Sequence, residues 1–188
     1  METSSCLLDK FIVDFSYQKV TEISRMAKQY QNNIKILFVC HGNICRSPLA
    51  EYILRDMVTK RGDSAGFYIA SAATSTEEIG NPVHHGTRHK LKEVGIPCGD
   101  HRARQMRRED YDAFDYIIGM DSWNIRNIGR IIGNSDPERK VFRLLDFTER
   151  KGEDIADPWY TGDFDTTYRD VREGCEALLA WICQENHL

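Results

Sequence analysis

The residues best suited to chemistry in this chain are Cys40 and Arg46, which bracket five residues and are followed at once by Ser47 and Pro48. A cysteine becomes a strong nucleophile when it is held as a thiolate. The guanidinium of Arg46 presents its N–H donors as a planar fork that matches two oxygens of a phosphate. A nucleophile and an oxyanion clamp at this spacing predict attack of sulfur on a bound phosphoryl group. An ordinary strand-to-helix turn around a buried cysteine would need neither Arg46 nor the second cysteine, Cys45.

The segments on either side of this loop would position its backbone. Residues 34–39 are apolar and predict a buried strand, and residues 48–60 predict a helix with Ser47 as its N-cap and Pro48 as its first residue. The loop amides and the positive end of the helix dipole would then face one point, which is an anion site. Besides Cys40 and Arg46, the phosphate-binding loop comprises His41, Gly42, Asn43, Ile44, Cys45 and Ser47.

Three loop residues have predicted roles besides presenting their amides. Asn43 tolerates a positive φ, so it can bend the loop with the amides inward. The Ser47 hydroxyl can cap the helix or bind the sulfur of Cys40, and both roles are compatible. For Cys45 two roles stay open: a resolving thiol that traps oxidised Cys40 as a disulfide, or a small apolar residue packed under the loop.

Asp157 opens a late Asp-Pro-Trp-Tyr motif and is the candidate general acid. The oxygen of a phosphate ester departs with difficulty unless it receives a proton. A carboxylic acid within hydrogen-bond distance accelerates such a step roughly 10²–10⁴-fold. An isolated Asp-Pro pair more often starts a turn. Behind a phosphate-binding loop, we interpret Asp157 as the acid.

The segment from Val39 to Pro48 resembles the phosphate loop of the low-molecular-weight protein tyrosine phosphatases. Asp157 stands where that family carries its acid loop, and the likeness extends from about residue 34 to residue 181. The resemblance implies hydrolysis of phosphotyrosine in a protein substrate, through a phosphocysteine on Cys40. It implies no metal and no cofactor.

The same resemblance suggests residues that support the site. Ser71 and His101 stand where the family has side chains that hold the loop asparagine, Asn43. Trp159 and Tyr160 directly follow the acid, and we expect their rings to form walls of the substrate cleft. Such walls would stack on an aryl ester.

Three alternatives from other classes can be weighed on particular residues. A thioredoxin-coupled arsenate reductase needs two further cysteines on a downstream segment, and none lies between Cys98 and Cys175. A protein-arginine phosphatase of this fold typically has threonine after the loop asparagine, where this chain has Ile44. A non-enzymatic phosphocysteine carrier would not need Asp157.

The hydrophobic pattern predicts an α/β fold: a four-stranded parallel sheet flanked by helices on both faces, with the phosphate-binding loop between the first strand and the first helix. The remaining strands are predicted over 67–71, 116–120 and 141–145, and the remaining helices over 84–94, 122–132 and 165–184. Ligands of such sheets bind at the carboxyl ends of the strands, where Cys40 stands.

Composition excludes several other classes. The 188 residues are enough for one domain, and a net charge of −4 argues against nucleic acid as a partner. No apolar run approaches the roughly 20 residues that span a bilayer, so we expect no membrane insertion. The six cysteines show neither paired nor metal-ligand spacing, which favours a cytoplasmic protein with reduced thiols. No oligomeric state is predicted.

We expect the catalytic domain to span residues 33–188 and residues 1–32 to be an N-terminal extension. Apolar residues recur there at helical spacing, so the extension would be a packed helix, a partner-binding helix or disordered. A true start at Met26 is a further alternative. Asp9, Lys10 and Asp14 interrupt the apolar stretch 7–15, which makes it a poor signal peptide.

Overall fold

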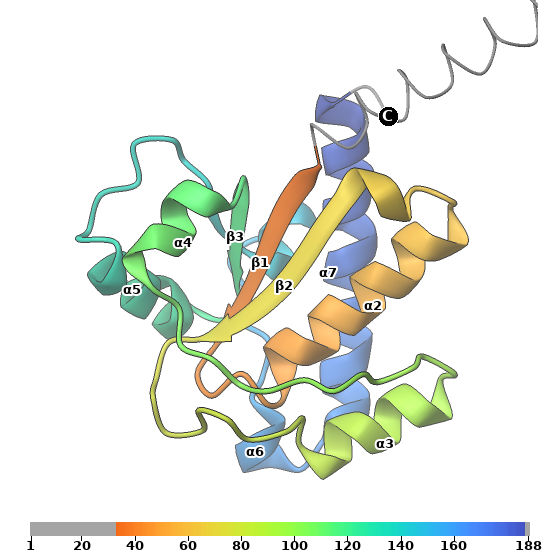
Figure 1. Ribbon diagram of the computed structural model, residues 1–188. Helices are drawn as coiled ribbons and strands as arrows, with labels where there is room; N and C mark the ends of the chain where they lie inside the picture. Colours follow the sequence, from red (N-terminus) through yellow and green to blue (C-terminus); the bar gives the residue numbers. More distant parts are fainter. Residues whose placement is uncertain (1–32, 187–188) are drawn as a thin grey trace, which may run out of the picture. The chain divides into compact units, whose positions relative to one another are not determined.

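Four parallel strands form one sheet within residues 33–186, the part of the chain that this computed structural model describes (Figure 1). The bounds of the strands are Ile34–Cys40 for β1, Phe67–Ala73 for β2, Tyr116–Gly119 for β3 and Val141–Arg143 for β4. Their order across the sheet is β2-β1-β3-β4, and each strand runs parallel to its neighbours. The predicted four-stranded parallel sheet is confirmed.

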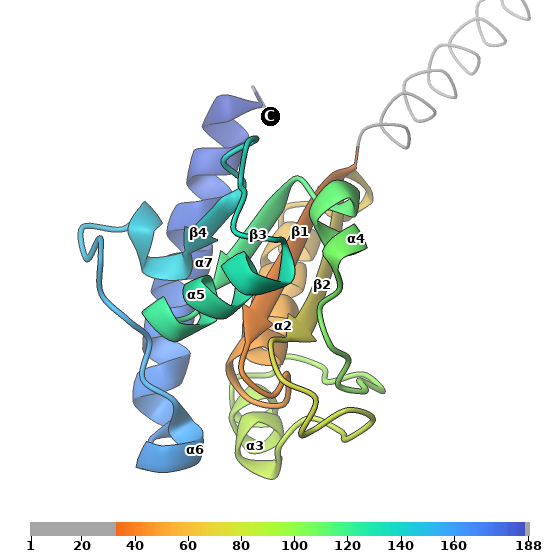
Figure 2. The same ribbon diagram turned by 90° about the vertical axis from the view of Figure 1, so that its left-hand side faces the viewer.

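Helices cover both faces of this sheet. Their bounds are Arg46–Lys60 for α2, His85–Glu93 for α3, Arg108–Ala113 for α4, Ser122–Ile131 for α5, Pro158–Thr161 for α6 and Phe164–Glu185 for α7. Ile36 and Phe38 of β1 join the core with α2 and α7, whereas Leu37 and Val39 join the core with α4 and α5. Figures 1 and 2 show these two pairs of helices on opposite sides of the sheet. Because both faces are buried, β1 reads as an almost continuous apolar run.

Every predicted strand and helix is present, but several ends differ. The strand predicted over 141–145 stops at Arg143, because Leu144–Phe147 form a 3₁₀ turn in which Asp146 accepts a hydrogen bond from the Arg143 amide. The helices α4 and α6 were not predicted. Each is too short for its apolar residues to repeat at helical spacing.

The predicted N-cap of the first helix is wrong. Helix α2 begins at Arg46, its N-cap is Cys45, and no side chain caps it. The hydroxyl of Ser47 is engaged elsewhere: it lies 3.1 Å from the Cys40 sulfur and accepts a hydrogen bond from Asn43. The amides of the first turn are therefore not covered by a serine cap and stay available to an anion.

The predicted N-terminal extension, residues 1–32, lies outside the described residues. The compact unit that carries the sheet spans Ile34–Leu188.

Candidate active site

The candidate active site lies at the carboxyl end of β1, where its last residue, Cys40, leads into a tight loop and the start of α2 (Figure 1). Arg46 is the first residue of that helix. A cleft opens above Cys40 and Arg46, and Asp157 lines the same cleft. Its other lining residues include His41, Gly42, Ile44 and Cys45 of the loop, and Trp159 and Tyr160 beyond the acid. The predicted nucleophile, clamp and acid thus share one cavity.

The sulfur of Cys40 is surrounded by hydrogen-bond donors. Cys40 is only 3% exposed, the amide of Asn43 donates to its Sγ atom at 3.3 Å, and the Ser47 Oγ atom lies 3.1 Å away. Ser47 Oγ accepts from Asn43 Nδ2 at 2.9 Å, and its single proton can go either to the sulfur or to the Ala72 carbonyl oxygen at 3.4 Å. These contacts hold the sulfur at the start of α2, where the loop amides and the helix N-terminus meet.

Asn43 holds the loop in its bent form. Its φ is +58°, in the left-handed region that few residues other than glycine adopt. The second proton of its Nδ2 atom goes to Ser71 Oγ at 2.8 Å, and Ser71 in turn donates to buried Glu51 at 2.5 Å. An ion pair of 2.8 Å with Arg55 balances Glu51. A buried chain of hydrogen bonds therefore fixes the predicted partner Ser71 and, through it, the loop.

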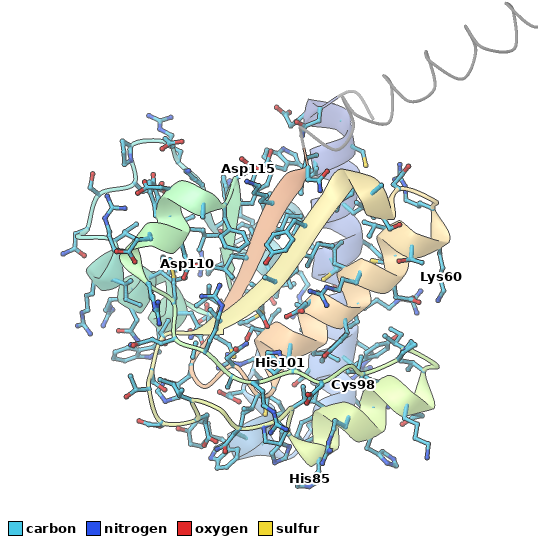
Figure 3. The ribbon with its side chains drawn as sticks, in the orientation of Figure 1. Lys60, His85, Cys98, His101, Asp110 and Asp115 are labelled. Carbon is cyan, nitrogen blue, oxygen red and sulfur yellow. The ribbon has the colours of Figure 1, made fainter. Side chains whose placement is uncertain are left out.

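The backbone of the loop is held from the other side by His101. Its Nε2 atom donates to the carbonyl oxygen of Asn43 at 2.8 Å, and the amide of Arg104 donates to Asn43 Oδ1 at 3.1 Å. Figure 3 labels His101 in the segment that passes the carboxyl end of β2 and the start of α2. Both residues predicted to contact Asn43 do so.

Arg46 is buried, and it is held by two carboxylates. Its Nη1 atom donates to Asp121 at 2.5 Å and to the Ile155 carbonyl at 3.0 Å, and its Nη2 atom donates to Asp157 at 2.5 Å. Its buried Nε atom has no hydrogen-bond partner in the described part of the protein. Burial acts to lower the pKa of Arg46, but the charges of Cys40, Asp157 and Asp121 outweigh it and raise the pKa. The guanidinium stays charged, with one unpaired donor left for an oxyanion.

Asp157 is fixed by its place at a helix start. It is the N-cap of α6, where its Oδ1 atom accepts from the amide of Trp159 at 3.1 Å and Pro158 is the first helical residue. Its side chain is 20% exposed. Asp157 can therefore exchange protons with a ligand in the cleft and with solvent.

The two aromatic residues after the acid stand at the mouth of the cleft. Trp159 is 56% exposed and Tyr160 is 83% exposed, so neither packs the loop onto the protein core. The ring of Trp159 makes an edge contact with His84, which stacks on Phe164. This placement agrees with the predicted wall positions.

Cys45 is buried and lies beside Ile44 and Ala103. Burial, together with the negative charges of Cys40 and Asp157, raises the pKa of Cys45 to about 12. Its thiol is therefore protonated at neutral pH, unlike a thiol poised to react.

Two carboxylates of this site were not predicted from the sequence. Asp121 follows β3 and pairs with Arg46, and Glu51 of α2 accepts from Ser71. Asp121 could have been found, because a polar residue at the carboxyl end of a strand next to β1 must lie near Cys40. Nothing in the local pattern around Glu51 signals its role.

Comparison with known proteins agrees with this geometry. The family model described as low molecular weight phosphotyrosine protein phosphatase matches residues 35–188. The chain belongs to this family. A curated relative, the low molecular weight protein-tyrosine-phosphatase YfkJ of Bacillus subtilis, is 43% identical over 156 residues, which cover 82% of this chain and 99% of the relative. The family named from the phosphate loop is thereby confirmed.

Solved structures of the family share the fold. The crystal structure of YfkJ from Bacillus subtilis matches with a TM-score of 0.77 and 43% identity, over 81% of this chain and 96% of that chain. An arginine phosphatase of Drosophila matches with a TM-score of 0.73 and 32% identity, over 79% of this chain and 98% of that chain.

Among the described residues, no helix is long and apolar enough to cross a membrane.

Proposed function

We propose that this phosphatase hydrolyses phosphotyrosine in protein substrates through a phosphocysteine on Cys40, with Asp157 as general acid and base. The observation that carries the proposal is the buried Arg46. Two carboxylates hold its Nη atoms while its Nε donor has no partner among the described residues, and the candidate nucleophile lies in the same cleft. A phosphate oxyanion fits such a site.

In the first step the thiolate of Cys40 attacks phosphorus, so that a sulfur–phosphorus bond forms and the ester oxygen–phosphorus bond breaks. Asp157, protonated, gives its proton to the departing tyrosyl oxygen. Arg46 and the loop amides bind the equatorial oxygens, where negative charge spreads in the transition state.

In the second step a water molecule gives a proton to the carboxylate of Asp157 and attacks phosphorus. Inorganic phosphate leaves and the Cys40 thiolate returns. The hydroxyl of Ser47, 3.1 Å from that sulfur, donates to the thiolate as the bond breaks. Asp157 regains the proton it needs for the next cycle.

Arginine phosphate is the second candidate substrate, because an arginine phosphatase is among the matching structures. Ile44 lines the cleft where arginine phosphatases typically have threonine. An apolar side chain there favours an aryl group over a guanidinium. We therefore place phosphotyrosine first.

The experiment compares matched phosphotyrosine, phosphoarginine and phosphoserine peptides with wild-type protein and Cys40→Ser in the presence of EDTA. We expect turnover of phosphotyrosine above the others in the wild type and none with Cys40→Ser. Faster turnover of phosphoarginine would overturn the substrate class. Loss of wild-type turnover in EDTA would contradict metal-independent catalysis.

We further propose that the enzyme acts in the cytoplasm on phosphoproteins. The five cysteines described in the structure are free thiols, which suits a reducing compartment. Fractionation of cells with antibody detection tests this proposal, and recovery only outside the cytoplasm would contradict it.

A further inference from the structure

Two adjacent glutamates, Glu77 and Glu78, line the candidate active-site cleft from the loop after β2. They share the cleft with Arg46, whose buried Nε donor is unpartnered within the described residues. Acidic side chains at the mouth of a site for phosphate repel the phosphate itself. Their presence therefore points to attraction for another, cationic part of the ligand.

Few positively charged side chains offset the negative charges of these two glutamates. Glu77 Oε2 lies 3.0 Å from His41 Nε2, and the two side chains are 69% and 47% exposed. Glu78 accepts from the neutral amide of Asn81 at 2.7 Å. In the part of the chain that the structure describes, no lysine or arginine forms an ion pair with either glutamate.

The position of Glu78 is tied to the phosphate-binding loop. A Cβ atom added at Gly42 would lie 3.0 Å from Cγ of Glu78, so the glutamate side chain lies directly over the loop glycine. The absence of a side chain at Gly42 lets the carboxylate approach the loop. Glu78 thus stands within the cleft rather than on a distant surface.

The guanidinium of Arg46, on the floor of the cleft, does not neutralise the negative charges of Glu77 and Glu78 at the cleft rim. The Nη atoms of Arg46 are already bound to Asp121 and Asp157. Apart from His41, the rim is therefore acidic on the side of Glu77 and Glu78. A phosphotyrosine with a neighbouring lysine or arginine would place a cation next to these carboxylates while its phosphate binds the floor.

We infer that Glu77 and Glu78 are specificity-determining residues that select phosphotyrosine flanked by lysine or arginine. This inference rests on the proposed phosphotyrosine phosphatase function. Each exposed charge pair is expected to contribute roughly 2- to 5-fold in kcat/KM. Salt screens such pairs, because the Debye length falls to about 3 Å at 1 M.

The test uses three phosphotyrosine peptides that differ only in the residues on either side of the phosphotyrosine, which are lysine, glutamine or glutamate. Values of kcat/KM are measured at low and high ionic strength for wild type, Glu77→Gln, Glu78→Gln and the double variant. Glu109→Gln is the matched control, because Glu109 is an exposed glutamate of α4 outside the cleft lining. Hydrolysis of p-nitrophenyl phosphate by the wild type reports the proposed function separately.

We expect the wild type to prefer the lysine peptide over the glutamate peptide, and high salt to reduce that preference. Each cleft variant should lower the ratio of the two kcat/KM values roughly 2- to 5-fold, whereas the control variant should leave the ratio unchanged. If p-nitrophenyl phosphate is hydrolysed but the peptides react equally, the inference alone fails. The same holds if both glutamine variants keep the preference. Absence of p-nitrophenyl phosphate hydrolysis would overturn the proposed function.

Discussion

The Nη2 atom of Arg46 lies 2.5 Å from Oδ2 of Asp157, so the candidate acid competes with a bound phosphate for the charge of the same guanidinium. The neighbouring Nε donor of Arg46 is buried and unpartnered in the described structure. A phosphate that binds the Nε donor of Arg46 therefore lies beside the Asp157 carboxylate on the same guanidinium. Substrate binding and the position of the acid are coupled through this one guanidinium.

The first prediction concerns anion affinity. Asp157→Asn removes the competing negative charge from Arg46, so inorganic phosphate should bind roughly 5-fold more tightly at neutral pH. Titration calorimetry measures this, with Asp112→Asn, an exposed site on α4, as the matched control. Weaker binding by Asp157→Asn would show that the carboxylate assists the anion.

The second prediction concerns proton donation. Asp157→Asn should lower kcat on phosphotyrosine roughly 10²–10⁴-fold, because the phenolate must then leave without a proton. The loss should be smaller with p-nitrophenyl phosphate, whose leaving group needs less protonation. Steady-state kinetics on both substrates gives the comparison. Equal losses would remove Asp157 from the acid role.

The third prediction concerns the cleft wall. Trp159→Ala removes a ring that is 56% exposed at the mouth of the cleft, so its stability cost should be small. Loss of stacking should reduce kcat/KM for a phosphotyrosine peptide roughly 2- to 10-fold and leave phosphoserine unaffected. A lowered melting temperature with unchanged selectivity would assign Trp159 to packing instead.

The fourth prediction concerns Cys45 under oxidation. Burial and the negative charges of Cys40 and Asp157 raise the pKa of Cys45 to about 12, so Cys45 is protonated at neutral pH and its thiolate fraction increases with pH. If Cys45 resolves oxidised Cys40, the ratio of the Cys40–Cys45 disulfide to sulfinic Cys40 should increase with pH after peroxide treatment. Mass spectrometry measures both products, and dithiothreitol should restore activity.

The control for that experiment is Cys45→Ser, which should recover less activity after reduction. Detection of sulfinic Cys40 alone at every pH in the wild type would reduce Cys45 to a packing residue beside Ile44 and Ala103.

The local parts of the fold and site could be predicted because their signals are local. The apolar run that ends at Cys40 indicates a strand. Arg46, six positions later and followed by Ser47 and Pro48, indicates a loop and a helix start, and neither inference needs the remainder of the sequence. The position of the helix N-cap was wrong because serine caps are a statistical preference. Here the hydroxyl of Ser47 lies beside the Cys40 sulfur and accepts a hydrogen bond from the side-chain amide of Asn43, so it does not cap the helix.

Contacts across the sequence could be predicted only in part. Ser71 and His101 were assigned by family resemblance, whereas Glu51 and Asp121 were missed. The bond between Asp121 and Arg46 joins residues 75 positions apart, and only the parallel pairing of β1 and β3 brings them together. Glu77 and Glu78 gave no signal either, because a pair of acidic residues in a loop is usually solvated surface.

The central claim is that phosphate passes through Cys40, and a trapped intermediate tests it most directly. Ser47→Ala should slow the second step, because the departing thiolate loses the hydroxyl 3.1 Å away. Rapid acid quench of this variant with a phosphotyrosine peptide, followed by mass spectrometry, should find phosphate on Cys40 and a burst of dephosphorylated peptide equal to the enzyme. Cys40→Ser should show neither. Turnover by Cys40→Ser, or phosphate on a residue other than Cys40, would contradict the account.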